Sequence, residues 1–206
     1  MLKFYHQNIY FMADLHLSHA NIIKYCKRPF ENVNEMNVQI LGNLREIASE
    51  DNVLFMLGDI FFETDMELLE EFGSILKEFK TVYIIPGNHD HTKTQRLIAR
   101  FTKPKHPKIN SNILYSENDI MEISIEDDEM AQAARLILCH YPIARWNAQY
   151  HGSWHLFGHT HRTYQHPSYN AIDVGIDNWN YKPISYNKVK EIITTQNLDS
   201  KYLYGN

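Results

Sequence analysis

The sequence predicts an α/β fold of two packed, mixed β-sheets flanked by helices. The first half of the 206-residue chain alternates strand-like and helix-like segments, which is typical of βαβ units. The second half consists mainly of strand-like segments joined by short turns. The chain is long enough for one well-filled core and contains no repeat or long linker, so we expect residues 1–206 to form a single domain.

Five short apolar runs each end in residues that can bind metals. Each run has about the length of a strand and is rich in Val, Ile, Leu, Phe or Tyr, so each predicts a buried strand. These runs are Asn8–Leu15, Asn52–Leu57, Thr81–Ile85, Arg135–Cys139 and Trp154–Phe157. Further strands are expected over Asn112–Tyr115, Asp119–Glu126, Ala171–Gly175 and Ile184–Tyr186. Since open α/β sheets bind ligands beyond the carboxyl ends of their strands, we expect the five runs to deliver polar residues to one rim.

Helices are predicted where apolar residues recur at helical spacing. Residues 35–49 and 65–80 each place their apolar side chains on one helical face. A shorter helix is expected over Asn21–Lys27, whereas Val189–Thr194 fits either a last strand or a helical turn. Capping residues are expected at the helix starts: Ser18, Thr64 with Glu67, and Thr92 with Gln95 after Asp90.

Composition limits the class of protein and its partners. The chain is 44% hydrophobic and 22% charged, and its net charge of −5 disfavours extended nucleic-acid binding, which normally needs a basic face. A small phosphorylated substrate is compatible with that charge. Residues 1–6 lack the apolar region of a signal peptide, and no apolar stretch approaches the ~20 residues that span a bilayer. We expect a cytoplasmic protein without a membrane partner, in which Cys26 and Cys139 are buried free thiols.

The polar residues that follow the five runs form a set of seven oxygen and nitrogen donors without sulfur. They are Asp14, His16, Asp59, Asn88, His140, His159 and His161. Asp14 and His16 are two residues apart, and so are His159 and His161. On extended segments the two side chains of each pair would therefore point the same way. Seven donors exceed the needs of one divalent ion but suit two ions that share a carboxylate. Ligands of this type favour Mn²⁺, Fe, Zn²⁺, Co²⁺ or Ni²⁺ over Ca²⁺, and we expect Mn²⁺.

The charge of such a centre indicates its substrate. Two divalent ions bring four positive charges, and two aspartates with a bridging hydroxide remove three. An open pair of ions ~3.5–4 Å apart can hold phosphate oxygens while it lowers the pKa of its water. The set therefore favours displacement at phosphorus.

The motifs resemble, in order, those of the calcineurin-like metallophosphoesterases. They are Asp14-x-His16, Gly58-Asp59, Gly87-Asn88-His89-Asp90, His140 and Gly158-His159-x-His161. The resemblance extends from about Asn8 to Gly175. The chain is most similar to the small single-domain bacterial and phage phosphoesterases of that superfamily, on the segments 18–23, Arg28-Pro29-Phe30 and 173–177.

This resemblance implies a four-layer αββα sandwich and a role for each donor. One ion would be held by Asp14, His16, Asp59 and His161, and the second by Asp59, Asn88, His140 and His159. Asp59 would bridge them. His89 would be the catalytic residue, either as the acid for the leaving oxygen or as a donor to the phosphoryl group. Asp90 is expected to cap the following turn or to orient a ligand histidine.

One position departs from the superfamily's protein phosphatases. Many of these carry a GDxxDRG segment whose second Asp pairs with the catalytic His, whereas this chain has Phe62 there. The departure disfavours a protein phosphatase and leaves open whether His89 is the general acid.

Substrate contacts are less clearly marked by the sequence. His19 is expected near a helix N-terminus, where it is either a substrate contact or a simple surface residue. Arg28 and Arg145 are candidate phosphate contacts because a planar guanidinium matches phosphate oxygens, although an exposed loop charge explains each as well. Aromatic residues cluster after His140 and after the last motif, where core packing or self-association is favoured over nucleobase stacking. Homo-oligomer formation is therefore open.

The sequence thus predicts a hydrolase that cleaves a phosphomonoester or phosphodiester by direct attack of a metal-bridging hydroxide. No Ser, Cys or Asp outside the ligand set is placed as a nucleophile, so no covalent phosphoenzyme is expected. A nuclease acting on short substrates, a cyclic-nucleotide phosphodiesterase and a non-catalytic metal-binding scaffold are the alternatives.

Overall fold

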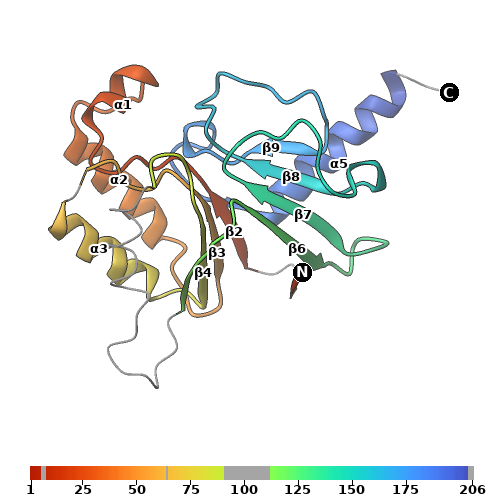
Figure 1. Ribbon diagram of the computed structural model, residues 1–206, viewed down its shortest axis with the longest axis horizontal. Coiled ribbons are helices and arrows are strands. Elements are labelled where there is room, and N and C mark those ends of the chain that lie inside the picture. Colours follow the sequence, from red (N-terminus) through yellow and green to blue (C-terminus); the bar gives the residue numbers. More distant parts are fainter. Residues whose placement is uncertain (6–7, 64, 91–111, 204–206) are drawn as a thin grey trace.

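The computed structural model contains two five-stranded β-sheets with helices at their sides (Figure 1). It describes residues 1–5, 8–63, 65–90 and 112–203, with side chains up to residue 196. Both sheets are mixed, since each combines parallel and antiparallel pairs. The protein is therefore an α/β fold with two mixed sheets flanked by helices, as the sequence predicted.

The first sheet has the strand order β10-β2-β3-β4-β5. Its strands are β2 (Ile9–Met12), β3 (Val53–Leu57), β4 (Thr81–Ile85), β5 (Ile113–Tyr115) and β10 (Ile184–Ser185). β2 to β5 are parallel, whereas the edge strand β10 is antiparallel to β2. All five residues of β3 are buried, as expected for a central parallel strand covered on both faces.

The second sheet has the order β1-β6-β7-β8-β9. Its strands are β1 (Leu2–Tyr5), β6 (Ile120–Glu126), β7 (Ala134–Cys139), β8 (Trp154–Phe157) and β9 (Ala171–Asp173). β7, β8 and β9 are parallel to one another, and β6 is antiparallel to β7. The sequence analysis missed β1, a short and largely exposed edge strand that pairs in parallel with β6.

Three helices lie together on the outer side of the first sheet, at the left of Figure 1. They are α1 (Ala20–Tyr25), α2 (Val33–Arg45) and α3 (Met66–Leu76), and their apolar faces share one core with that sheet. On the opposite side, α5 (Tyr186–Leu203) contacts β2, β9 and β10, strands of both sheets. The segment Val189–Thr194 is thus helical, which decides between the two expected conformations. Short 3₁₀ turns occur at Gln149–His151 and Ile176–Asn178.

The helix caps differ from those expected. Asp65 caps α3, since its side chain accepts a hydrogen bond from the Leu68 amide, and the expected capping residue Thr64 lies outside the described residues. The cap position of α1 is His19, which makes no capping side-chain hydrogen bond, so the expected cap at Ser18 is wrong. The expected cap at Thr92 and Gln95 lies outside the described residues.

A second core fills the space between the two sheets. It combines the inner faces of both with residues of α5, including Phe11, Phe55, Leu136 and Val189. An isolated bridge joins Ala13, just after β2, to Gly175, just after β9. The carboxyl ends of strands from the two sheets therefore meet at one rim. Among the described residues, no helix is long and apolar enough to cross a membrane.

Candidate metal centre

Six of the seven expected donors form two groups at this rim. Asp14, His16 and His161 make the first, and Asp59, His140 and His159 make the second. Within each group the ligand atoms all lie within 4.8 Å of one another. The residues follow β2, β3, β7 and β8, so the donors come from both sheets and not from a single one.

One carboxylate oxygen lies between the two groups. Oδ2 of Asp59 is 3.6 Å from Nε2 of His16 in the first group and 3.4 Å from Nε2 of His140 in the second. The other oxygen, Oδ1, accepts a hydrogen bond from the His89 amide. Asn88, the seventh expected donor, places its Oδ1 3.1 Å from Nε2 of His140. Asp59 thus has one oxygen fixed by the backbone and one directed toward both groups.

Left-handed backbone conformations aim these side chains. Positive φ angles occur at five of the seven donors, namely Asp14, His16, Asp59, His159 and His161. The extended geometry assumed from the i, i+2 spacing is therefore wrong. Asp14 and His16 still enter the same group, but His159 and His161 enter different groups. Such conformations cost energy for residues other than glycine and concentrate at functional sites.

Glycines make room for the two carboxylates. A Cβ added to Gly87 would lie 2.3 Å from Oδ1 of Asp59, and one added to Gly158 or Gly175 would lie 2.6 Å from Oδ2 of Asp14. Glycine is thus the residue that lets the backbone approach this closely. Both Asp14 oxygens also accept from the His159 amide.

Two of the candidate ligand histidines have defined surroundings: a backbone carbonyl contacts His140, and His16 has an unpartnered nitrogen. Nδ1 of His140 lies 2.7 Å from the Leu57 carbonyl, to which it can donate, and its Nε2 faces Oδ2 of Asp59 at 3.4 Å. Burial opposes protonation of His140, but its contacts with Asp59 and Asp14 outweigh burial and raise its pKa. Nε2 of His16 is buried and has no hydrogen-bond partner among the described residues. Burial lowers the pKa of His16 to about 2, so its imidazole is neutral at pH 7. An unpartnered, neutral imidazole nitrogen facing a carboxylate is what a metal ligand requires.

The two aspartates differ in protonation. Burial raises the pKa of the Asp14 carboxyl to about 7. Burial also opposes ionisation of Asp59, but its hydrogen bond with His140 and its other contacts outweigh this and hold its pKa at about 2. Both carboxyl groups are buried near the neutral His16 imidazole, where a bound cation would stabilise their ionised forms. The orphaned His16 nitrogen, the glycine cradles and the all-nitrogen-and-oxygen donor set therefore fit divalent metal ions.

A buried Asp90 holds the backbone at Asp59. Its carboxylate accepts hydrogen bonds from the amides of Asp59, Ile60 and Gly87, at 2.6, 3.1 and 2.9 Å. These contacts join the two loops that follow β3 and β4. Asp90 thus fixes the backbone of the candidate ligand Asp59, and not a ligand histidine as expected.

Arg28 lies beneath the centre and not at its surface. The residue is 4% exposed, and its guanidinium donates to both Asp177 oxygens, at 2.9 and 2.8 Å, and to the carbonyls of Asp14 and Leu15. Every guanidinium nitrogen is bonded inside the protein. The prediction of a phosphate contact and the alternative of an exposed loop charge are therefore both wrong. The apolar and backbone environment of Arg28 could not be read from its neighbours in sequence.

Asp177 is a site residue to which the sequence analysis assigned no role. Its Oδ2 lies 2.8 Å from Nδ1 of His161 and also accepts from Arg28. Burial opposes protonation of His161, but the hydrogen bond that its Nδ1 donates to Asp177 outweighs burial and raises the pKa of His161 to about 10. The only sequence signal was an acidic residue shortly after the last strand.

The remaining expected residues have different positions. His89 is exposed, and its ring lies 5.4 Å from that of the expected ligand His16. His19 is only 7% exposed, which corrects its interpretation as a surface residue, and its Nδ1 is 3.3 Å from Nδ1 of His16. Arg145 donates to the Tyr150 hydroxyl in the loop after β7, and its phosphate contact stays a prediction. Both expected free thiols are free, with Cys139 buried and Cys26 partly buried.

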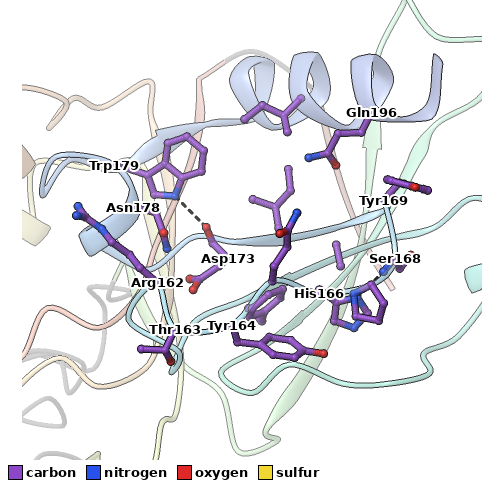
Figure 2. A pocket seen from close by; sticks show the side chains of 16 residues that line it. Arg162, Thr163, Tyr164, His166, Ser168, Tyr169, Asp173, Asn178, Trp179 and Gln196 are labelled. Carbon is purple, nitrogen blue, oxygen red and sulfur yellow. Dashed lines mark hydrogen bonds between the residues drawn. The ribbon is translucent and has the colours of Figure 1, made fainter. Parts of the chain in front are cut away.

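A large polar pocket lies beside the last motif. It has a volume of about 860 Å³ and is lined by the segment from Arg162 to Tyr169, by Trp179 and by Gln196 of α5 (Figure 2). Asp173 points into it, and its carboxylate accepts a hydrogen bond from Thr160, between two expected ligands. The pocket has one side chain of each charge sign, Arg162 and Asp173, and does not indicate one class of ligand.

The family profile of the calcineurin-like phosphoesterases matches residues 7–163. This span covers most of the chain and includes every donor named above. The chain belongs to this family. Membership implies metal-dependent hydrolysis of phosphoesters, and the two donor groups agree with a metal-binding member.

Comparison with similar proteins supports the fold of this chain but indicates no activity. The uncharacterised protein MJ1445 of Methanocaldococcus jannaschii is 26% identical over 198 residues, which cover 91% of this chain and 92% of that protein. The crystal structure of AQ665 from Aquifex aeolicus, a protein of unknown function, matches with a TM-score of 0.60 at 20% identity, over 89% of this chain and 98% of that one. The phosphopantetheinyl hydrolase of Mycobacterium tuberculosis aligns with a TM-score of 0.31 at 15% identity, over 63% of this chain and 40% of that one. A similarity that weak supports no inference.

Proposed function

We propose that this phosphoesterase binds two divalent metal ions and hydrolyses a small phosphorylated substrate by direct attack of water. The observation that carries the proposal is the position of Asp59 Oδ2, within 3.6 Å of a histidine nitrogen of each donor group. A carboxylate oxygen between two ligand groups suits a shared ligand. When bound, two ions would neutralise phosphoryl oxygens and lower the pKa of water.

Each donor has a proposed place in this centre. Asp14, His16 and His161 would hold the first ion, Asn88, His140 and His159 would hold the second, and Asp59 would serve both. We propose Mn²⁺ as the native ion. The donor set also accepts several other transition metals. Because Ca²⁺ takes oxygen ligands, we expect no preference for it in a donor set with four imidazoles.

His89 is the proposed catalytic residue. It is exposed, its backbone amide donates to Asp59, and its ring lies 5.4 Å from that of His16. From there it can protonate the leaving oxygen or donate to the phosphoryl group. Water attack without a covalent phosphoenzyme predicts inversion at phosphorus.

The experiment uses protein stripped of metal and reloaded separately with Mn²⁺, Ni²⁺, Zn²⁺ or Mg²⁺. Rates are measured on p-nitrophenyl phosphate and on bis-p-nitrophenyl phosphate, with metal content determined in parallel. We expect metal-dependent turnover in the wild type. Asp59→Asn should lose bound metal and reduce turnover by at least 100-fold, because the shared ligand loses its charge.

The relative rates decide the ester class. Faster diester cleavage directs the search to short or cyclic nucleotides, and faster monoester cleavage directs it to phosphorylated metabolites. Near-normal turnover in Asp59→Asn would refute the shared-ligand role. A wild type that binds metal but turns over neither ester would favour the non-catalytic scaffold.

A further inference from the structure

Four aromatic rings form a closed cluster at the rim of the metal centre. They belong to His16, His19, Phe62 and His89. His19 lies flat against Phe62, with ring centroids 3.6 Å apart and an interplanar angle of 6°. The His16 ring lies 5.3 Å from His19 and 5.4 Å from His89, and Phe62 lies 5.4 Å from His89. Each ring therefore contacts two others within the range of aromatic pairs.

The cluster is buried at one end and open at the other. His16 and His19 are 2% and 7% exposed, whereas Phe62 is 45% exposed. Since His19 covers one face of Phe62, the exposed area lies on the remaining face and edge. The phenyl ring is thus an apolar surface that is already fixed by a buried neighbour, so little side-chain entropy would be lost when a ligand covers it.

We propose that Phe62 determines specificity for the leaving group, and that the substrates are phosphoesters that carry a planar aromatic group there. This rests on the proposed function, in which His89 faces the leaving oxygen. Of the two rings beside His89, His16 is buried and Phe62 is exposed, so the group attached to that oxygen meets Phe62. A flat ring gains a stacking contact on the open phenyl face.

Other leaving groups would fit this surface less well. A charged or strongly hydrated group would lose water against the phenyl face without receiving a hydrogen bond. The nearby guanidinium of Arg28 cannot compensate, because it is buried and bonded to Asp177. The rim therefore favours nucleoside-like or aryl esters over simple sugar phosphates.

The test compares benzyl phosphate with cyclohexylmethyl phosphate, and the methyl diesters of the same two alcohols. Both are primary alcohols of similar size, so the pairs differ mainly in aromatic character. The wild type should prefer benzyl esters. Phe62→Ala and Phe62→Leu should lower the benzyl to cyclohexylmethyl ratio of kcat/KM about fivefold, whereas Phe62→Trp should preserve it. Tyr5→Ala, an exposed aromatic residue in β1, serves as the matched control.

Binding of benzylphosphonate and cyclohexylmethylphosphonate, measured by calorimetry on the Mn²⁺-loaded protein, separates this inference from the proposed function. If no ester is turned over but the protein still binds benzylphosphonate more tightly, and this preference depends on Phe62, hydrolysis is refuted and the stacking role is supported. Equal losses for both esters and both phosphonates in Phe62→Ala and Phe62→Leu would overturn the role of Phe62.

Discussion

Individual residues at the rim accept strain that the surrounding contacts compensate. Asp59 combines a positive φ of 55° with a buried carboxylate, and an amide hydrogen bond to Asp90 holds its backbone in place. Left-handed conformations at residues other than glycine cost of the order of 1 kcal/mol or more each. These conformations let the side chains of the loops converge on one site. Extended strands with the same residue spacing would have kept those side chains apart.

The contact between Asp177 and His161 makes the first prediction at this scale. Asp177→Asn should weaken Mn²⁺ binding at the His161 group by about 10–100-fold, because the carboxylate orients the ring and increases its basicity. Calorimetry with Mn²⁺ measures the affinity of each site. Arg28→Lys should give a smaller loss, since it keeps the charge but loses the two-pronged contact with Asp177.

Glu46→Gln is the control for these variants. Glu46 makes an exposed ion pair with Lys182, far in sequence from every expected ligand. Its removal should leave Mn²⁺ affinity unchanged. If Asp177→Asn also bound both ions with wild-type affinity, the positioning role would be wrong.

At the scale of elements, α5 is attached by its first two turns to the turn after β6. The Tyr186 hydroxyl donates to Asp127 at 3.0 Å, and the Lys190 ammonium donates to the same oxygen at 2.8 Å. Asp127 is buried, which by itself would raise its pKa, but the hydrogen bonds from Lys190, Glu129 and Tyr186 outweigh burial and lower it. The carboxylate thus connects α5 to the second sheet.

Asp127→Asn should reduce the free energy of unfolding by about 2 kcal/mol at pH 7, because a charged hydrogen-bond acceptor is lost. A carboxyl with a lowered folded pKa stabilises above its ordinary pKa of about 4 and loses that contribution as pH falls through the folded value. The difference between wild type and variant should therefore shrink below pH 4. Urea unfolding across pH 3–7 measures it.

Glu129→Gln is the matched control. Glu129 also accepts from Lys190, but its side chain is 78% exposed, so its removal should cost at most about 0.5 kcal/mol. Equal losses in the two variants would show that burial of Asp127 contributes nothing.

At the scale of the whole molecule, the candidate metal centre lies where the two sheets meet. β2 and β3 of the first sheet carry Asp14 and Asp59, and β7 and β8 of the second carry His140 and His159. The bridge between Ala13 and Gly175 is the backbone part of the same junction. Ions bound there would link the two sheets, so metal binding should stabilise the entire fold.

Metal binding should raise the melting temperature. An ion present at 100 times its dissociation constant stabilises the folded state by about 2.7 kcal/mol, which corresponds to about 5–10 °C for a chain of this length. The increase should be larger at pH 8 than at pH 6. The pKa values of Asp14 and His161, about 7 and 10, mean that metal must displace more protons at the lower pH.

Scanning calorimetry with and without Mn²⁺ at the two pH values measures this increase. The unfolded state is common to both measurements, so its titration cancels. Asp14→Asn should lose most of the metal-induced increase while the metal-free protein keeps or gains stability, because the buried charge is gone. An increase that is independent of pH would contradict the protonation of Asp14.

The sequence by itself determined the positions of every described strand except β1, the mixed α/β class and the seven candidate donors. Local hydrophobic pattern decides where a buried strand lies, and β4 and β8 have the predicted bounds. The order of donor motifs was enough to indicate the family, which the profile over residues 7–163 shows. These features depend on residues that are close together along the chain, so they can be predicted from a single sequence.

Only the tertiary structure decided how the donors divide and what supports them. His159 and His161 are two residues apart, yet left-handed backbone sends them to different groups. Arg28 and Asp177 are 149 residues apart and meet only when the second sheet closes on the first. β1 became a strand because β6 offered it an edge. Burial, ring stacking and long-range hydrogen bonds depend on which segments share space, and the order of residues does not specify that directly.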